Sequence, residues 1–160
     1  MIVAQITVYI AMATLVAVAW NDVRELKIRN FTVIVLILLY VIHILFMRLH
    51  GLPGDLMAGI LLFLIGLGMW LVGGMGAGDA KLMFVIGLFT GYFALPIFAI
   101  LLLLVSIVLF MLILIAAKTG RTTGVLGRLA RMRREGHVPY AVPLVIAALP
   151  SMLLGLYGPS

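Results

Sequence analysis

Cysteine is absent from the 160-residue chain. Its absence excludes disulfide bonds, thiolate nucleophiles and sulfur ligands for a metal, and it gives no indication of the redox compartment. Charged residues are also scarce, at 10% of the chain, where a soluble domain carries about a quarter. Only five residues are acidic, so each carboxylate can be weighed individually as a candidate for chemistry.

Apolar residues make up 66% of the chain, and several apolar runs reach the roughly 20 residues that a helix needs to cross a bilayer. The sequence therefore predicts an all-α, polytopic membrane protein, folded as a single helical bundle over residues 1–160. The net charge of +6 is typical of a membrane protein with basic cytoplasmic loops, so no nucleic-acid partner is expected.

Six transmembrane helices are expected, separated by polar or glycine-rich segments. The first polar loop spans residues 21–30, a glycine-rich stretch spans 73–81, Pro96 marks a turn, and a second basic loop spans 118–137. The expected helices cover residues 2–20, 31–49, 56–72, 80–92, 97–117 and 138–157.

Basic residues are distributed unevenly over the loops of this topology. Only Arg48 falls on one side, and lysine and arginine favour the cytoplasm. Both chain termini are therefore expected on the non-cytoplasmic side, with the glycine-rich stretch at the cytoplasmic face. The basic residues on the cytoplasmic side are Arg24, Lys27, Arg29, Lys81 and six more between residues 118 and 134.

Three of the acidic residues have simple structural interpretations. Asp55 follows a glycine- and proline-containing turn, where it is expected to cap the next helix. Glu135 lies among arginines, where a solvated salt bridge is expected. Glu25 is interpreted as a loop charge, and the attraction of a basic substrate remains open as an alternative.

Asp22 and Asp79 differ because the predicted topology brings both to the same membrane face, each beside the end of a helix. Two carboxylates a few ångströms apart share a proton, and the pair can activate a water while protonating a carbonyl oxygen. Peptide hydrolysis is the reaction that suits such a pair. Two alternatives remain open: Asp79 as a helix N-cap, and Asp22 as a charge paired with Arg24 or Lys27.

Four glycines occur between residues 73 and 78, directly before Asp79. Small residues can serve close helix packing, but this density of glycine also predicts a departure from helical geometry that lets a substrate backbone approach.

His43, His50 and His137 share no metal-ligand spacing with an acid, so no metal or other cofactor is expected. His43 is interpreted as a packed or hydrogen-bonding residue.

Three motifs resemble those of type IV prepilin peptidases. Residues 76–81, Gly-Ala-Gly-Asp-Ala-Lys, match the Gly-x-Gly-Asp-x-Lys pattern of that family, which presenilins share in part. The segment from Asp22 to Asn30 resembles the family's other aspartate segment, although Arg29 stands where proline is common. Residues 138–143 resemble the Pro-Tyr-Ala segment that opens the last helix, and the short chain resembles the compact, tight-adherence (Flp-type) branch.

The resemblance implies an endopeptidase that removes the basic leader from pilin precursors at the cytoplasmic face of a prokaryotic inner membrane. It implies Asp22 and Asp79 as the catalytic pair. Membrane lipid is expected to contact the basic loop 118–134, and whether the chain forms a homo-oligomer stays open. The other peptidase site residues are the motif residues Gly76, Gly78, Lys81 and Asn30, with Glu25 as a possible contact of the substrate leader.

The alternative function is a small transporter or channel subunit that uses Asp79 to move a proton or cation.

Overall fold

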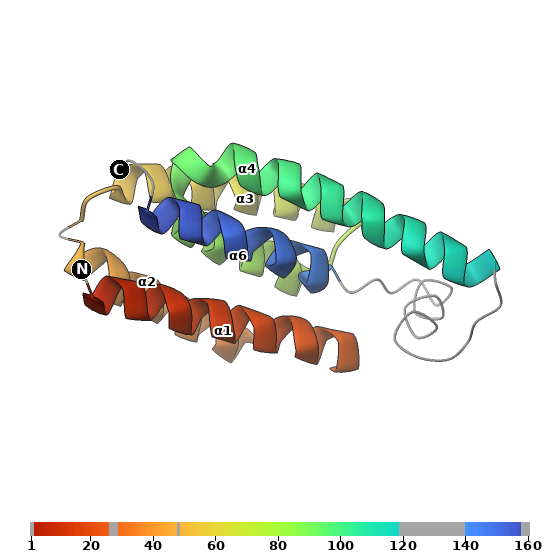
Figure 1. Ribbon diagram of the computed structural model, residues 1–160, viewed down its shortest axis with the longest axis horizontal. Helices are drawn as coiled ribbons and strands as arrows, with labels where there is room; N and C mark the ends of the chain where they lie inside the picture. Colours follow the sequence, from red (N-terminus) through yellow and green to blue (C-terminus); the bar gives the residue numbers. More distant parts are fainter. Residues whose placement is uncertain (1, 26–28, 48, 119–139, 158–160) are drawn as a thin grey trace.

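The computed structural model describes residues 2–25, 29–47, 49–118 and 140–157. Helices dominate this part of the chain (Figure 1), which confirms the all-α prediction. They are α1 (Ile2–Glu25), α2 (Asn30–Phe46), α3 (Leu52–Leu71), α4 (Ala77–Lys118) and α6 (Ala141–Tyr157).

Three of the described helices, α1, α3 and α4, are long and apolar enough to cross a membrane. The remaining two, α2 and α6, are apolar and 17 residues long. The chain is thus built as a membrane helical bundle. Helix α4 contains both the fourth and the fifth predicted span, so six separate crossings remain a prediction. The membrane side on which the two termini lie also remains a prediction.

Helix α4 is interrupted at Gly91, where φ is 66° and ψ is 167°. These angles lie in a region that glycine enters without the steric penalty of a Cβ atom. In Figure 1 the chain runs towards one end of the bundle before this break and returns from it afterwards. The turn expected at Pro96 is therefore wrong: Pro96 lies inside helix, five residues after the break at Gly91.

The first segment of α4, residues 77–90, packs closely against α3. A Cβ atom on Gly87 would lie 2.6 Å from the Cα of Gly59, and one on Gly66 would lie 3.0 Å from the Cα of Ala80. Small residues let two membrane helices approach to backbone contact, which increases dispersion attraction between them. This contact sets the position of α4, and with it the two ends of its first segment.

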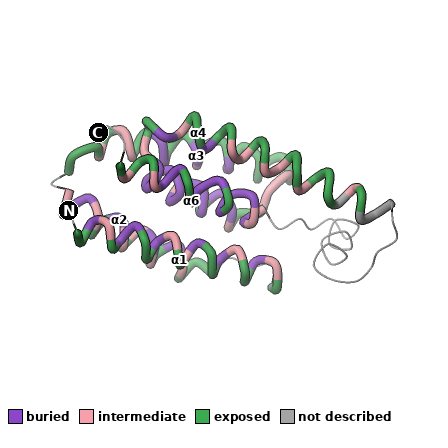
Figure 2. The backbone as a smooth tube through the Cα atoms, in the orientation of Figure 1, coloured by how far each residue is buried: buried purple, intermediate pink, exposed green. Residues whose placement is uncertain are grey.

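The other helices surround this close pair. Helix α6 packs on α4 and α1, and α2 packs on α1 and α4. Figure 2 shows buried residues concentrated on α6 and on the sides of its neighbours, whereas the second segment of α4, residues 92–118, is largely exposed. Its exposed side chains include Ile97, Ile100, Leu103 and Leu104, as contact with lipid requires.

Two helix boundaries differ from the sequence predictions. Helix α1 continues to Glu25, so Asp22 is helical and the predicted loop 21–30 is too long. Residues 21–25 contain neither glycine nor proline to end the helix. Helix α4 begins at Ala77, so Gly78 and Asp79 are helical, and only Val72 to Gly76 depart from helical geometry as predicted for the glycine stretch.

The expected role of Asp55 as a helix cap is also wrong. Gly51 is the N-cap of α3, and proline follows in the first turn, where its missing N–H costs nothing. Asp55 therefore lies inside α3, and its Oδ2 accepts a hydrogen bond of 2.8 Å from the Tyr40 hydroxyl of α2.

Both ends of the described chain lie at one end of the bundle (Figure 1). Tyr9 near the start of α1 and Tyr157 at the end of α6 are joined there, with 3.2 Å between their hydroxyl oxygens. Asp22 lies towards the opposite end, near Ala141 at the start of α6. The bundle therefore has two distinct ends, which carry different polar groups.

Substitution of Gly87 by alanine tests the contact between α3 and α4. The added Cβ would meet the backbone of Gly59, so we expect Gly87→Ala to lower the free energy of unfolding by about 1–3 kcal/mol. Gly68→Ala is the matched control, because a Cβ at Gly68 meets nothing within 4 Å. Unfolding with increasing SDS in mixed micelles measures both, and equal stabilities would contradict the close contact.

Candidate active site

Asp22 lies in the last turn of α1 and is buried, at 6% exposure. Its Oδ2 accepts a hydrogen bond of 3.4 Å from the backbone N–H of Ala141, the first residue of α6. A carboxylate near the C-terminal end of a helix is electrostatically unfavourable for that helix, and the amides at the start of another helix offset this cost. Helix α6 therefore helps to hold Asp22.

Asp79 is the third residue of α4 and is buried as well, at 8% exposure. Its carboxylate folds back to accept a hydrogen bond from the Gly76 amide, which is one half of a capping-box arrangement. Asp79 is therefore not the N-cap itself, although its carboxylate satisfies one amide at the start of the helix. The other oxygen, Oδ1, has no hydrogen-bond partner among the described residues, although burying an unpaired acceptor costs about 1–3 kcal/mol.

The tertiary structure brings the two aspartates together. Asp22 comes from α1 and Asp79 from α4, and their carboxyl groups interact electrostatically. Arg24 does not take the place of this partner, because its guanidinium lies over the Trp20 ring, 4.9 Å from the ring centroid. Lys27, the other alternative partner of Asp22, lies outside the described residues. The site thus contains two buried acids, and one oxygen of Asp79 has no hydrogen-bond partner in the described ranges.

Lys81 and Asn30, both named from the motifs, contact each other. The Lys81 ammonium donates a hydrogen bond of 3.0 Å to Oδ1 of Asn30 at the start of α2. The motifs name both residues but give no sign that they contact each other, because they lie 51 residues apart in the chain. The bond ties the start of α2 to the start of α4, beside Asp79.

The remaining candidates have separate positions. Gly76 is exposed and non-helical, and Gly78 is half-buried in the first turn of α4. Glu25 is the last residue of α1, and its side chain lies outside the described part. Tyr140, half-buried, directly precedes the Ala141 amide that holds Asp22.

The histidines give no sign of a metal centre in the described ranges. His43 Nδ1 lies 3.0 Å from the carbonyl oxygen of Ala4 and 3.3 Å from the Thr7 hydroxyl, which confirms it as a packed, hydrogen-bonding residue. Within these ranges no three His, Cys, Asp or Glu side chains gather so that they could hold a metal.

Fold and site together define a class: a helical membrane protein with two buried, interacting carboxyl groups towards one end of its bundle. The chain belongs to the type IV leader peptidase family, whose model matches residues 9–120. This match confirms the resemblance to prepilin peptidases and implies a protease that acts on prepilins. No curated protein and no solved structure matches the chain.

A double-mutant cycle tests the bond between Lys81 and Asn30. We expect Lys81→Met and Asn30→Ala to couple by about 0.5–1.5 kcal/mol in the free energy of unfolding, because either substitution removes the same hydrogen bond. Asn21→Ala, at another exposed asparagine, is the control and should add to Lys81→Met without coupling. Additive effects in both cycles would show that the bond contributes nothing to stability.

Proposed function

We propose that this protein is an aspartyl endopeptidase that removes the basic leader from Flp-type prepilins at the cytoplasmic face of a prokaryotic inner membrane. The observation that carries the proposal is the pair of buried, interacting carboxyl groups of Asp22 and Asp79 in a chain of the leader peptidase family. Family membership favours hydrolysis over the alternative in which Asp79 moves a proton or cation through a transporter.

The pair acts by general acid and base catalysis. Two neighbouring carboxyl groups share one proton, because two negative charges in a buried site repel each other. The ionised group takes a proton from a water molecule as its oxygen attacks the scissile carbonyl carbon. The protonated group donates its proton to the carbonyl oxygen, and the tetrahedral intermediate then collapses with protonation of the departing amine.

Both aspartates are held by backbone amides, which suits them to a fixed geometry. Asp22 is held by the backbone of α6 and Asp79 by the backbone of Gly76. Backbone donors have fewer degrees of freedom than side chains, and catalytic groups must be placed to within a fraction of an ångström. Oδ1 of Asp79 is buried and has no hydrogen-bond partner among the described residues, so we assign to it the proton exchange with a water or a substrate carbonyl.

The glycine-rich turn offers a route for the substrate. Residues 72–76 are non-helical, and Gly76 is exposed next to the buried Asp79. A peptide bond must leave helical geometry before it can be hydrolysed, and a glycine lets an extended backbone approach without a side chain in the way. The basic leader of a prepilin would then lie near Glu25 at the end of α1.

Basic residues at the aspartate end support a cytoplasmic site. Lys81 follows Asp79 by two residues, and it contacts Asn30, which directly follows Arg29. Arg24 is exposed two residues beyond Asp22. Lysine and arginine collect on the cytoplasmic side of membrane proteins, so this end of the bundle is assigned to the cytoplasm.

Replacing either aspartate by asparagine tests the catalytic pair. Because neither amide can exchange the proton, we expect Asp22→Asn and Asp79→Asn each to slow cleavage at least about 10³-fold. Cleavage of a small pilin precursor in membranes, followed by immunoblotting with enzyme abundance checked, measures the rate. Glu135→Gln is the control and should process normally, whereas full processing by either aspartate variant would exclude the mechanism.

The position of the Asp79 carboxylate is tested by two glycines of the same turn. A Cβ atom on Gly76 would lie 2.9 Å from Oδ2 of Asp79, so Gly76→Ala should displace the carboxylate and slow cleavage about 10- to 100-fold. Gly74→Ala is the control, since its nearest contact would be 3.4 Å, to the Met69 carbonyl oxygen. The same assay should give Gly74→Ala a nearly normal rate. Equal rates for the two variants would refute the positioning role.

A further inference from the structure

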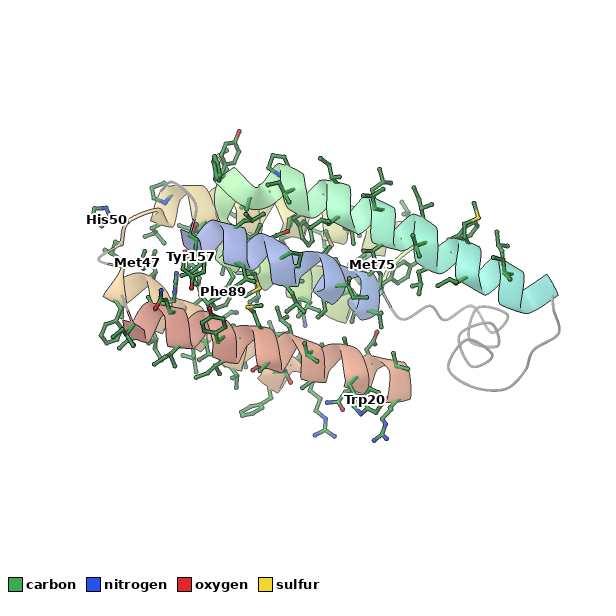
Figure 3. The ribbon with its side chains drawn as sticks, in the orientation of Figure 1. Trp20, Met47, His50, Met75, Phe89 and Tyr157 are labelled. Carbon is green, nitrogen blue, oxygen red and sulfur yellow. The ribbon has the colours of Figure 1, made fainter. Side chains whose placement is uncertain are left out.

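A second polar site lies away from the aspartate pair, where α3 begins and α6 ends. A cavity of about 480 Å³ opens there between α2, α3, α4 and α6, within the size range of small-molecule sites. Figure 3 shows Met47, His50 and Phe89, which line the cavity, on the side of the bundle away from Trp20 and Met75. Neither Asp22 nor Asp79 lines this cavity.

Asp55 supplies a fixed carboxylate to the cavity wall. Its Oδ2 accepts a hydrogen bond of 2.8 Å from the Tyr40 hydroxyl. Its Oδ1 lies against the break in α4, where a Cβ on Gly91 would come within 2.8 Å of it. The carboxylate thus reaches from α3 across to α4 at the point where glycine leaves room for it. Among the described lining residues there is no lysine or arginine.

Thr90 is an independent observation that points to a ligand at this site. It lines the cavity and is fully buried, and its hydroxyl oxygen has no hydrogen-bond partner in the described part of the chain. Buried hydroxyl groups are usually satisfied because desolvation without a partner is costly. A ligand group beside Asp55 could provide the partner, since Thr90 directly precedes Gly91 in α4.

Aromatic rings complete the wall. Phe89 lines the cavity, and its ring meets that of Tyr40 edge to face with 5.5 Å between the centroids. The His43 ring lies 6.0 Å from Phe89. A carboxylate next to aromatic rings attracts an organic cation through its charge and through the ring quadrupole. The described residues provide no three-ligand group for a metal ion, so an ammonium group fits this wall better than a bare metal ion.

From these contacts we propose that the cavity binds a primary ammonium group, with Asp55 as its counter-ion and Thr90 as a hydrogen-bond partner. The cavity lies beside the turn that joins α2 to α3, where a membrane bundle meets the lipid headgroups. The ethanolamine headgroup of a phospholipid carries such an ammonium group at that depth. Free ethanolamine is the other source of the same chemistry.

Lipid binding to the full-length protein tests the proposal. Native mass spectrometry in detergent would compare phosphatidylethanolamine with phosphatidylglycerol of the same acyl chains, and free ethanolamine would form a third arm. We expect the ethanolamine lipid to bind about tenfold more tightly than the glycerol lipid. Asp55→Asn should remove this preference, and Thr90→Val should reduce it. Asp22→Asn, which removes a carboxylate at the other site, should retain it.

Each outcome decides the proposal. Equal binding of the two lipids, or an unchanged preference in Asp55→Asn, would overturn it, as would loss of the preference in Asp22→Asn. Displacement of the lipid by free ethanolamine at matched concentration would assign the site to a soluble amine instead of a headgroup. If Asp55→Asn does not fold, the wild-type comparison and Thr90→Val decide. Lipid binding needs no peptidase activity, so this test is independent of the proposed hydrolysis.

Discussion

The backbone contact between α3 and the first segment of α4 is the constraint on which both polar sites depend. Gly59 and Gly87 meet with no space for a Cβ between the helices, and this fixes the first segment of α4 against α3. One end of that segment carries Asp79, and the other leads through Thr90 into the break at Gly91. A shift of the segment would therefore move the catalytic candidate and the wall of the second cavity together.

The two sites treat their carboxylates differently. Asp22 and Asp79 are held by backbone amides, and one oxygen of Asp79 is left without a partner in the described structure. Asp55 is held by the Tyr40 hydroxyl and lies among aromatic rings and glycines. The first arrangement suits proton transfer between neighbouring acids, and the second suits a stable counter-ion.

Helix α6 shows why a match to part of the chain does not describe the whole site. The match to the family model covers residues 9–120, yet the Ala141 amide that holds Asp22 belongs to α6. A backbone donor has no sequence signature, because every residue except proline provides one. The Pro-Tyr-Ala resemblance pointed to this segment, whereas the hydrogen bond itself follows only from the packing of α6 against α1 and α4.

The sequence by itself determined the membrane-helical class, the family and the two aspartates as candidates, because hydrophobic run length and a short motif are local properties of the chain. Tertiary structure decided that the carboxyl groups of Asp22 and Asp79 interact, that Lys81 contacts Asn30, and that Asp55 contacts Tyr40 and lies against Gly91. It also moved the turn from Pro96 to Gly91. These features are contacts between residues that lie far apart in the sequence. Local helix propensity cannot specify them, because the packing of the helices decides which residues of different helices come into contact.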